Sequence, residues 1–280
     1  MREISVKTVT ENIKNMCIEA NHFLSPDVKK GLIEAVDTEE STLGRQILNQ
    51  LKENLMIAVE DMIPICQDTG MAIVFAEIGQ EVHFTDGSLD EAINEGIREG
   101  YTEGYLRKSV VSDPILRVNT KDNSPGIIHY SIVPGDKVKL TLAPKGFGSE
   151  NMSRVFMLKP ADGLEGVKNA VLTAVKDAGP NACPPMVVGV GVGGDFEKCA
   201  IMAKKALTRP LGEHSSIDWV KETEIELLDR INKSGIGPGG LGGTTTALGV
   251  NILTYPTHIA GLPVAVNICC HVNRHVTVEI

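Results

Sequence analysis

Three of the six cysteines lie next to residues that favour loops and turns. They are Cys66 in Pro-Ile-Cys-Gln-Asp-Thr-Gly, Cys183 in Gly-Pro-Asn-Ala-Cys-Pro-Pro, and Cys270 in Asn-Ile-Cys-Cys-His. No Cys-x-x-Cys pair occurs, which argues against a zinc finger and a ferredoxin-type cluster. Three thiolates from separate loops can nevertheless hold a cubane iron–sulfur cluster. One iron then lacks a protein ligand and is free to act as a Lewis acid on a hydroxyl and a carboxylate.

The remaining cysteines have more ordinary surroundings. Cys17 and Cys199 fall within segments of helical periodicity, so they are predicted to be plain core or surface residues. Cys269 and Cys270 are adjacent, and adjacent side chains of a strand point to opposite faces of the sheet. Periodicity alone does not choose which of these two would be the third thiolate.

Several polar residues near the cysteines could bind a small acid. Asp68 beside Thr-Gly, Arg107 at a predicted helix end and His258 in Pro-Thr-His are each compatible with a purely structural role. A guanidinium is, however, the natural bidentate partner of a carboxylate, so Arg107 is the first candidate for a substrate clamp. Weaker candidates are Lys145, Arg154 and Arg274.

The elements that must position these residues indicate an α/β fold, with a helical N-terminal region and a mixed-sheet core whose loops converge on the cluster. The expected division is 1–60 for the helical region and 61–280 for the core, the two possibly forming one continuous domain. Strands are predicted over 71–78, 127–133, 136–143, 251–255 and 262–270, and a strand followed by a loop over 185–194. Helices are predicted over 88–107, 161–178, 195–207 and 217–235.

The overall composition limits the class of protein. The chain has 280 residues, of which 42% are hydrophobic and 22% charged, as in soluble globular proteins. Its net charge of -9 argues against binding to nucleic acid or to an anionic membrane. No apolar run of about 18 residues and no apolar signal-peptide core occur, so a cytoplasmic location is expected.

Five segments together resemble the α subunit of two-subunit class I fumarases. They are PICQDTG, PKGFGSENMS, GPNACPPMVVGVGVGG, GIGPGGLGGTTTALGV and PTHIAGLPVAVNICCHVNRH, in the family's order from about residue 66 to the C-terminus. The related L-tartrate dehydratase α subunit shares the general pattern. The resemblance implies a hydro-lyase that interconverts fumarate and L-malate with a [4Fe–4S] cluster on Cys66, Cys183 and Cys270. The family pattern Cys-His-x-x-Arg selects Cys270 over Cys269.

The resemblance also implies catalytic groups and substrate contacts. Asp68 is expected to protonate the leaving hydroxyl, with His258 assisting. In the fumarase branch the loop usually reads Lys-Gly-Gly-Gly-Ser, and here Phe147 replaces a glycine. The Lys-Gly-x-Gly-Ser-Glu-Asn form of this loop favours fumarate over tartrate. The expected substrate contacts are Gln67, Arg107, Gly146 and Gly148.

A second subunit is expected as well. Anti-elimination needs a Lewis acid at the leaving hydroxyl, a base at the carbon proton and clamps on both carboxylates of a small dicarboxylate. The sequence offers no convincing second base and only one strong clamp. The resemblance therefore implies a β subunit that supplies the base and further clamps, in an α2β2 assembly.

Three other interpretations remain open. Gly189 to Gly194 match Gly-x-Gly-x-x-Gly, which is typical of NAD-binding oxidoreductases. A dinucleotide unit needs a following strand that ends in an acid, whereas here a loop and another helix follow. If these glycines bind no dinucleotide, they would permit close backbone approach near the Cys183 loop. The run GPGGLGG before three threonines could cradle an anion or simply pack. A cluster-bearing scaffold or redox sensor is the non-enzyme alternative.

Overall fold

The computed structural model describes residues 1–280, and the chain divides into two compact units. The predicted mixed α/β class is confirmed. The N-terminal 60 residues are shared between the two units. Unit 1 comprises Met1–Ser25, Leu55–Phe147 and Arg274–Ile280, and unit 2 comprises Pro26–Asn54 and Gly148–Asn273.

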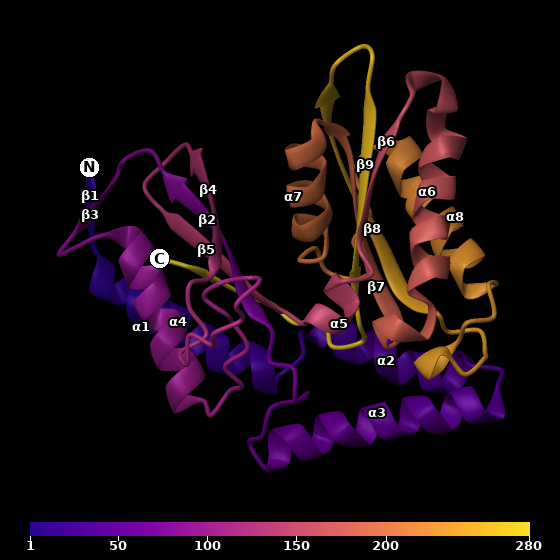
Figure 1. Cartoon of the computed structure of the whole chain (residues 1–280), viewed down its shortest axis with the longest axis horizontal. Helices are drawn as coiled ribbons and strands as arrows, with labels where there is room; N and C mark the ends of the chain where they lie inside the picture. The colour runs from indigo at the N-terminus through magenta and orange to yellow at the C-terminus, as the bar shows by residue number, and fades with distance from the viewer. The chain divides into compact units, whose positions relative to one another are not determined.

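Unit 1 is built on a four-stranded mixed sheet of order β10-β5-β2-β4. The central strand β2 runs antiparallel to β5 and parallel to β4. Helices α1 and α4 pack together over this sheet (Figure 1) and bury Ile13, Ile97 and Leu140. The bounds are β1 Arg2–Ser5, α1 Val6–His22, β2 Met71–Gly79, β3 Val82–Thr85, α4 Leu89–Glu103, β4 Ile127–Val133, β5 Val138–Lys145 and β10 Val276–Glu279.

Local sequence signals explain most of these elements. Ser88 caps α4 by accepting a hydrogen bond from the Glu91 amide at 3.5 Å, in agreement with the predicted helix start. The residues before the first helix form β1, which pairs in parallel with β3. That pairing joins segments about 80 residues apart, so the helical pattern of the N-terminus gave no indication of it.

Unit 2 is a three-layer arrangement around the sheet β6-β9-β7-β8. Helix α7 covers one face, and α6 and α8 cover the other (Figure 1). Strands β7 and β8 are parallel, and β9 is antiparallel to both β7 and β6. The bounds are β6 Arg154–Leu158, α6 Gly163–Ala178, β7 Met186–Gly194, α7 Phe196–Ala206, α8 Asp218–Asn232, β8 Ala247–Thr257 and β9 Leu262–Cys269.

Two further helices and several single turns complete the chain. The two helices α2 (Pro26–Thr38) and α3 (Thr42–Glu60) meet at a three-residue join, and the boundary between the units falls within α3. The Ser41 hydroxyl begins α3 by accepting a bond from the Gly44 amide at 3.1 Å. Single turns form α5 (Phe147–Glu150), η1 (Pro160–Asp162), η2 (Gly179–Ala182) and η3 (Pro238–Gly240).

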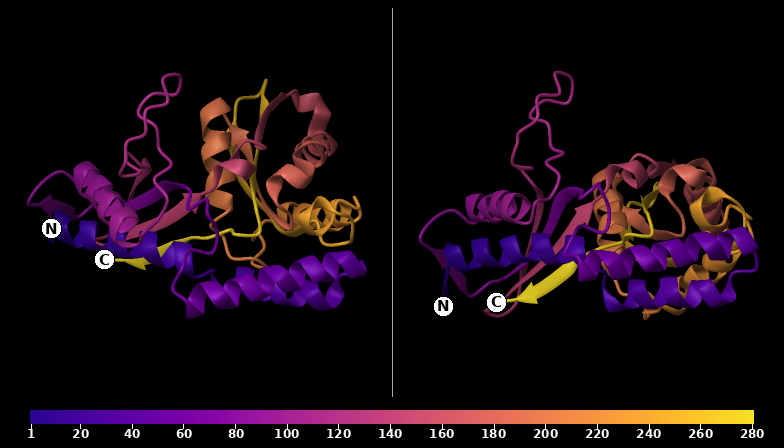
Figure 2. Two further views of the ribbon diagram at one scale, coloured as in Figure 1. Left: turned by 60° about the horizontal axis from the view of Figure 1, so that its bottom comes forward. Right: turned by 90° about the horizontal axis from the view of Figure 1, so that it is seen from below.

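Residues 108–123 of unit 1 extend away from its sheet as an irregular arm (Figure 2). Within the arm, the Ser112 amide donates to the Val118 carbonyl at 2.7 Å, and the Asp113 carboxylate accepts from two backbone amides near the tip. Ile115 and Leu116 at the tip are 85% and 77% exposed. No helix of the chain is both long and apolar enough to cross a membrane.

Candidate active site

Strand direction in unit 2 brings the Cys183 and Cys270 segments to the same end of the sheet. Cys183 lies three residues before the start of β7, and Cys270 immediately follows β9. The antiparallel register pairs Val187 with Cys269. The His271 amide donates to the Cys183 carbonyl at 3.4 Å, and the His271 Nδ1 atom lies 3.1 Å from the same oxygen. The two segments are therefore held against one another by backbone contacts.

The two adjacent cysteines have different environments. Cys269 is 4% exposed and packs with Val187 and Leu207 in a small apolar cluster. Cys270 lies beyond the strand and is half-buried. A hydrogen bond with the Cys269 thiol, together with burial, raises the pKa of the Cys270 thiol. Cys183 is exposed and has a left-handed backbone with φ of 52°.

Cys66 belongs to unit 1. Its loop is anchored to α1, because the Ile65 amide donates to the Asn21 carbonyl at 2.9 Å. The half-buried Cys66 thiol lies 3.7 Å from the Gln67 side-chain oxygen, and Gln67 itself is exposed. No group of three or more His, Cys, Asp and Glu side chains is arranged to hold a metal ion within either unit. Cys17 and Cys199 are fully buried, as predicted for core residues.

The Asp68 carboxylate links the first cysteine loop to the glycine-rich loop. Its Oδ1 atom accepts from the Gly70 amide and its Oδ2 atom accepts from the Phe147 amide, each at 2.9 Å. A Cβ atom at Gly146 would lie 3.2 Å from Oδ2, which is a tight contact. Both carboxylate oxygens are thus oriented by backbone donors, and each keeps a second lone pair for a ligand.

A buried arginine, Arg274, holds the backbone of both loops by hydrogen bonds. Arg274 is 4% exposed, and its guanidinium donates to the Pro144 carbonyl at 3.2 Å and to the Asp68 carbonyl. This arginine was considered from the sequence as a weak substrate clamp. Its hydrogen bonds instead show that it stabilises the backbone at Asp68.

Thr69 brings Arg107 close to Asp68 within unit 1. The Thr69 hydroxyl donates to the Arg107 carbonyl at 3.1 Å and accepts from the Arg107 amide at 2.9 Å. The buried Tyr101 hydroxyl donates to the carbonyls of Thr69 and Gly70, at 2.7 Å and 3.1 Å. Burial raises the pKa of Tyr101, so its phenol stays protonated as a donor. The Arg107 side chain is exposed, and its backbone is held in place.

The far side of the glycine-rich loop is fixed in unit 2. Gly148 is exposed, and the Glu150 carboxylate accepts from the Asn267 side-chain amide at 2.8 Å and forms an ion pair with Lys204. The Ser153 hydroxyl accepts from the Ile268 amide at 3.1 Å. These contacts attach the residues that follow Gly148 to β9, the strand that ends at the adjacent cysteines.

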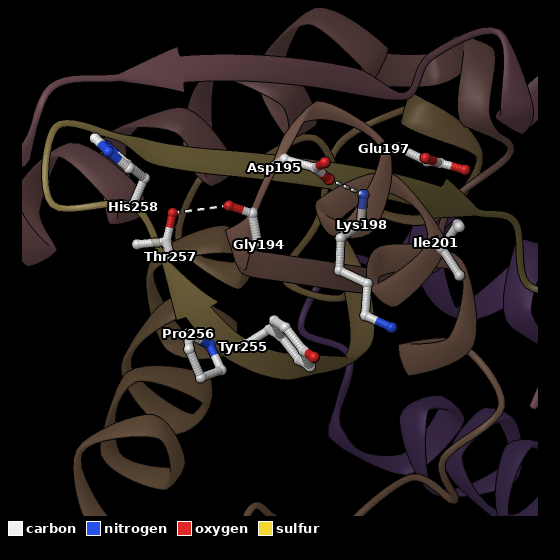
Figure 3. Close-up of a pocket in the computed structure, with 9 residues that line it drawn as sticks. All are labelled: Gly194, Asp195, Glu197, Lys198, Ile201, Tyr255, Pro256, Thr257 and His258. Carbon is white, nitrogen blue, oxygen red and sulfur yellow. Dashed lines mark hydrogen bonds between the residues drawn. The ribbon is translucent and has the colours of Figure 1, made fainter. Parts of the chain in front are cut away.

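The structure does not bring His258 to the cysteines of its own unit. His258 follows β8 and lies beside Thr257, which pairs with Gly194 at the end of β7 (Figure 3). Cys269 pairs with Val187, seven residues earlier on β7, which places the two ends about 23 Å apart. His258 therefore lies at the opposite end of the unit 2 sheet from Cys183 and Cys270. The expected assistance of His258 to Asp68 stays a prediction.

His258 instead lines a separate open hollow of about 560 Å³ in unit 2. The hollow includes the start of α7, where the Asp195 carboxylate accepts from the Lys198 amide at 2.8 Å (Figure 3). The Lys198 ammonium lies 4.9 Å from the ring centre of Tyr255. Nothing in this hollow corresponds to the cysteine loops at the other end of the sheet.

The Gly-x-Gly-x-x-Gly run serves helix packing. A Cβ atom at Gly191 would lie 2.1 Å from the Cys199 carbonyl of α7, so the glycine permits the close contact between β7 and α7. The chain then continues from α7 to α8 and not to a parallel strand, which a dinucleotide-binding unit requires. The sequence suggested a close backbone approach near the Cys183 loop. In the structure the close approach at Gly191 is instead made by α7.

The chain is similar to known proteins over almost its whole length. A family model described as fumarate hydratase (Fumerase) matches residues 10–279. A Methanocaldococcus jannaschii protein with the provisional name L(+)-tartrate dehydratase subunit alpha is 41% identical over 272 residues, covering 95% of each chain. L(+)-tartrate dehydratase subunit alpha of Escherichia coli K12 is 30% identical over 280 residues, covering 99% of this chain and 92% of its own. The Shigella sonnei subunit of the same name has the same identity and shares.

Proposed function

Since this chain belongs to the fumarate hydratase family, we propose that it is the α subunit of an iron–sulfur hydro-lyase whose substrate is L(+)-tartrate. The observation that carries the choice of substrate is the similarity, over almost the whole chain, to relatives named as tartrate dehydratase α subunits. These relatives favour tartrate over the fumarate that the glycine-rich loop led us to expect.

Fumarate and L-malate remain the second candidate pair. The loop Lys145-Gly146-Phe147-Gly148-Ser149 is the specific observation in their favour, because its form resembles that of the fumarase branch. Tartrate differs from malate by one additional hydroxyl. A pocket that hydrogen-bonds this hydroxyl would discriminate strongly against a substrate that lacks it, because buried polar groups would be left without partners.

The environments of the Cys183 and Cys270 thiols support a cluster with three protein ligands. Cys183 and Cys270 lie on adjoining segments outside the packed core, whereas Cys269 is inside it. We assign Cys66, Cys183 and Cys270 as the residues that would hold a [4Fe–4S] cluster. When bound, such a cluster supplies a Lewis-acidic iron for the leaving hydroxyl.

The other residues of the chain provide binding and proton transfer. Asp68, oriented by two backbone amides, delivers a proton to the leaving hydroxyl. The exposed fork of Arg107 binds one substrate carboxylate, and the exposed Gln67 side chain adds a polar contact to the substrate. The missing side chains at Gly146 and Gly148 let the substrate approach the backbone. The second base and further clamps come from a β subunit in an α2β2 assembly, in line with the α-subunit names of the relatives.

The substrate assignment is tested by a panel assay of the reconstituted αβ enzyme under anaerobic conditions. L(+)-tartrate, D-tartrate, meso-tartrate and L-malate are compared by kcat/KM, following oxaloacetate or fumarate formation. We expect L(+)-tartrate to exceed L-malate by at least about tenfold. A preference for malate would replace our proposal with the second candidate, and no dehydration of any of the four would refute both.

A further inference from the structure

Glu39, in the join between α2 and α3, has its carboxylate inside unit 2. The side chain is 2% exposed. Its Oε1 atom accepts from the amides of Ser41 and Thr244, each at 2.8 Å, and Oε2 accepts from the Thr245 amide at 2.7 Å. The Thr244 hydroxyl adds a contact of 3.2 Å to Oε1. The anion cradle suggested by the sequence is therefore occupied by a carboxylate of the chain itself.

The hydrogen bonds to the Glu39 carboxylate favour its ionised form. Burial acts to raise the pKa of Glu39, but the hydrogen bonds from Ser41, Thr244 and Thr245 outweigh it and the pKa lies below its usual value. The backbone leaves room for the group, since a Cβ atom at Gly243 would lie 2.6 Å from Oε1. Several donors converging on one buried anion fix the end of the glycine-rich segment 236–246, hereafter the glycine clamp.

The other side of the glycine clamp holds the Cys183 loop. The Gly239 amide donates to the Pro184 carbonyl at 2.9 Å. Gly240 has φ of +73°, and a Cβ atom there would lie 2.3 Å from the Cβ atom of Pro180, so the two segments are in direct contact. The Cys183 amide in turn donates to the Pro180 carbonyl at 3.1 Å. Cys183 thus lies in the sequence between Pro180 and Pro184, the two residues that the glycine clamp contacts.

We infer that Glu39 is a positioning residue for Cys183, acting through the glycine clamp. The inference rests on the proposed function only in that Cys183 is taken to be a cluster ligand. Glu39 neither contacts the thiol nor donates to it. Its carboxylate fixes the backbone that sets where Cys183 presents its sulfur, and partners of this indirect kind affect metal affinity about 10- to 100-fold.

The first test is amide hydrogen exchange of the full chain, read by mass spectrometry. Glu39→Gln keeps the size of the side chain but turns an amide NH2 toward backbone N–H donors. We expect exchange to become at least about tenfold faster in the glycine clamp and also in residues 179–185. A merely local role would accelerate the first segment alone, and that result would overturn the inference.

A matched control distinguishes a specific effect on the two segments from a general loss of stability. Glu224 is another fully buried carboxylate of unit 2, which accepts from the Ile252 amide at 2.8 Å and has no hydrogen bond to the glycine clamp. Glu224→Gln should leave exchange in both segments unchanged even where it lowers the melting temperature. If Glu39→Gln does not fold, Glu39→Asp provides a milder change, because it keeps the carboxylate on a shorter side chain. Glu39→Asp should accelerate exchange in the same two segments by a smaller factor.

The second test is retention of the cluster. The reconstituted Glu39→Gln chain should lose iron to a chelator about tenfold faster than wild type and give an altered electron paramagnetic resonance spectrum when reduced. Unchanged iron loss together with an unchanged spectrum would overturn the inference. Cys183→Ser separates the two ideas: full iron retention in that variant would refute the ligand assignment, while the exchange result for Glu39 would stand on its own.

Discussion

At the scale of single residues, the proposed ligand set depends on which thiols are packed in the apolar core. Cys270 and Cys269 are neighbours in sequence, but only Cys269 is packed among apolar side chains. Burial of that thiol removes it from contact with any ligand outside the core, whereas Cys270 lies past the end of β9 next to the Cys183 segment. The difference leads to a direct test of the proposed ligand set.

Single replacements of Cys66, Cys183 and Cys270 by serine should each remove most of the iron and sulfide from the anaerobically reconstituted chain, because a serine hydroxyl is not ionised at neutral pH and does not replace a thiolate. Cys269→Ser is the matched control. It should retain the iron while losing about 1–3 kcal/mol of stability, because it buries a hydroxyl among apolar groups. Iron and sulfide analysis with thermal unfolding measures both effects, and loss of iron from Cys269→Ser with retention in Cys270→Ser would exchange their assignments.

Arg107 combines a fixed backbone with an exposed side chain, which is the arrangement expected of a substrate clamp. Arg107→Lys keeps the positive charge but loses the planar fork. We expect kcat/KM of the αβ enzyme to fall about 10- to 100-fold, which corresponds to one charge-assisted hydrogen bond, with the iron content unchanged. Arg117→Lys, an exposed arginine on the arm, should have near-normal kinetics. Equal kinetics of the two variants would make Arg107 an ordinary surface residue.

At the scale of elements, the contact between β7 and α7 determines the shape of unit 2. Gly191→Ala would place a methyl group 2.1 Å from the Cys199 carbonyl, and the helix cannot retreat without opening the apolar cluster beneath it. We expect a loss of about 1–3 kcal/mol or more in the free energy of unfolding, measured by urea denaturation. A stability equal to that of wild type would show that α7 moves freely on the sheet.

Gly148→Ala is the matched glycine variant for that experiment. An added Cβ atom at Gly148 meets no atom within 4 Å, so stability should stay within about 0.5 kcal/mol of wild type. The proposed approach of substrate to this backbone nevertheless predicts a lower kcat/KM in the αβ enzyme. If kcat/KM also stays unchanged, Gly148 has no role in binding the substrate.

At the scale of the whole molecule, the proposed mechanism assigns one set of catalytic groups to this chain and a complementary set to a β subunit. The Asp68 region offers an acid and one guanidinium, and His258 is at the other end of its own sheet from Cys183 and Cys270. Cluster-loaded α chain alone should therefore show negligible dehydration of L(+)-tartrate or L-malate. Addition of the β subunit should restore turnover, measured together with the mass of the complex. Full activity of the α chain alone would require a second base among its own residues.

Local patterns in the sequence were sufficient for the elements themselves. The apolar run at 127–133 is β4 over the same residues, and the segment predicted as a helix over 161–178 forms α6 from Gly163 to Ala178. Capping and periodicity are short-range signals, so Ser88 and the apolar positions of α4 could be identified without knowledge of the fold. The motifs around the three cysteines were likewise sufficient to indicate the family.

Only the tertiary structure decided where those elements place their side chains. The sequence around Cys269 and Cys270 was compatible with either thiol facing outward, and packing against Leu207 on a distant helix end placed Cys269 in the core. His258 stands near Cys270 in the sequence, yet β9 runs between them and separates them by the length of the sheet. Glu39 gave no signal at all, since its Thr244 and Thr245 donors are about 205 residues away. Strand direction, register and long-range hydrogen bonds depend on partners that local sequence does not specify.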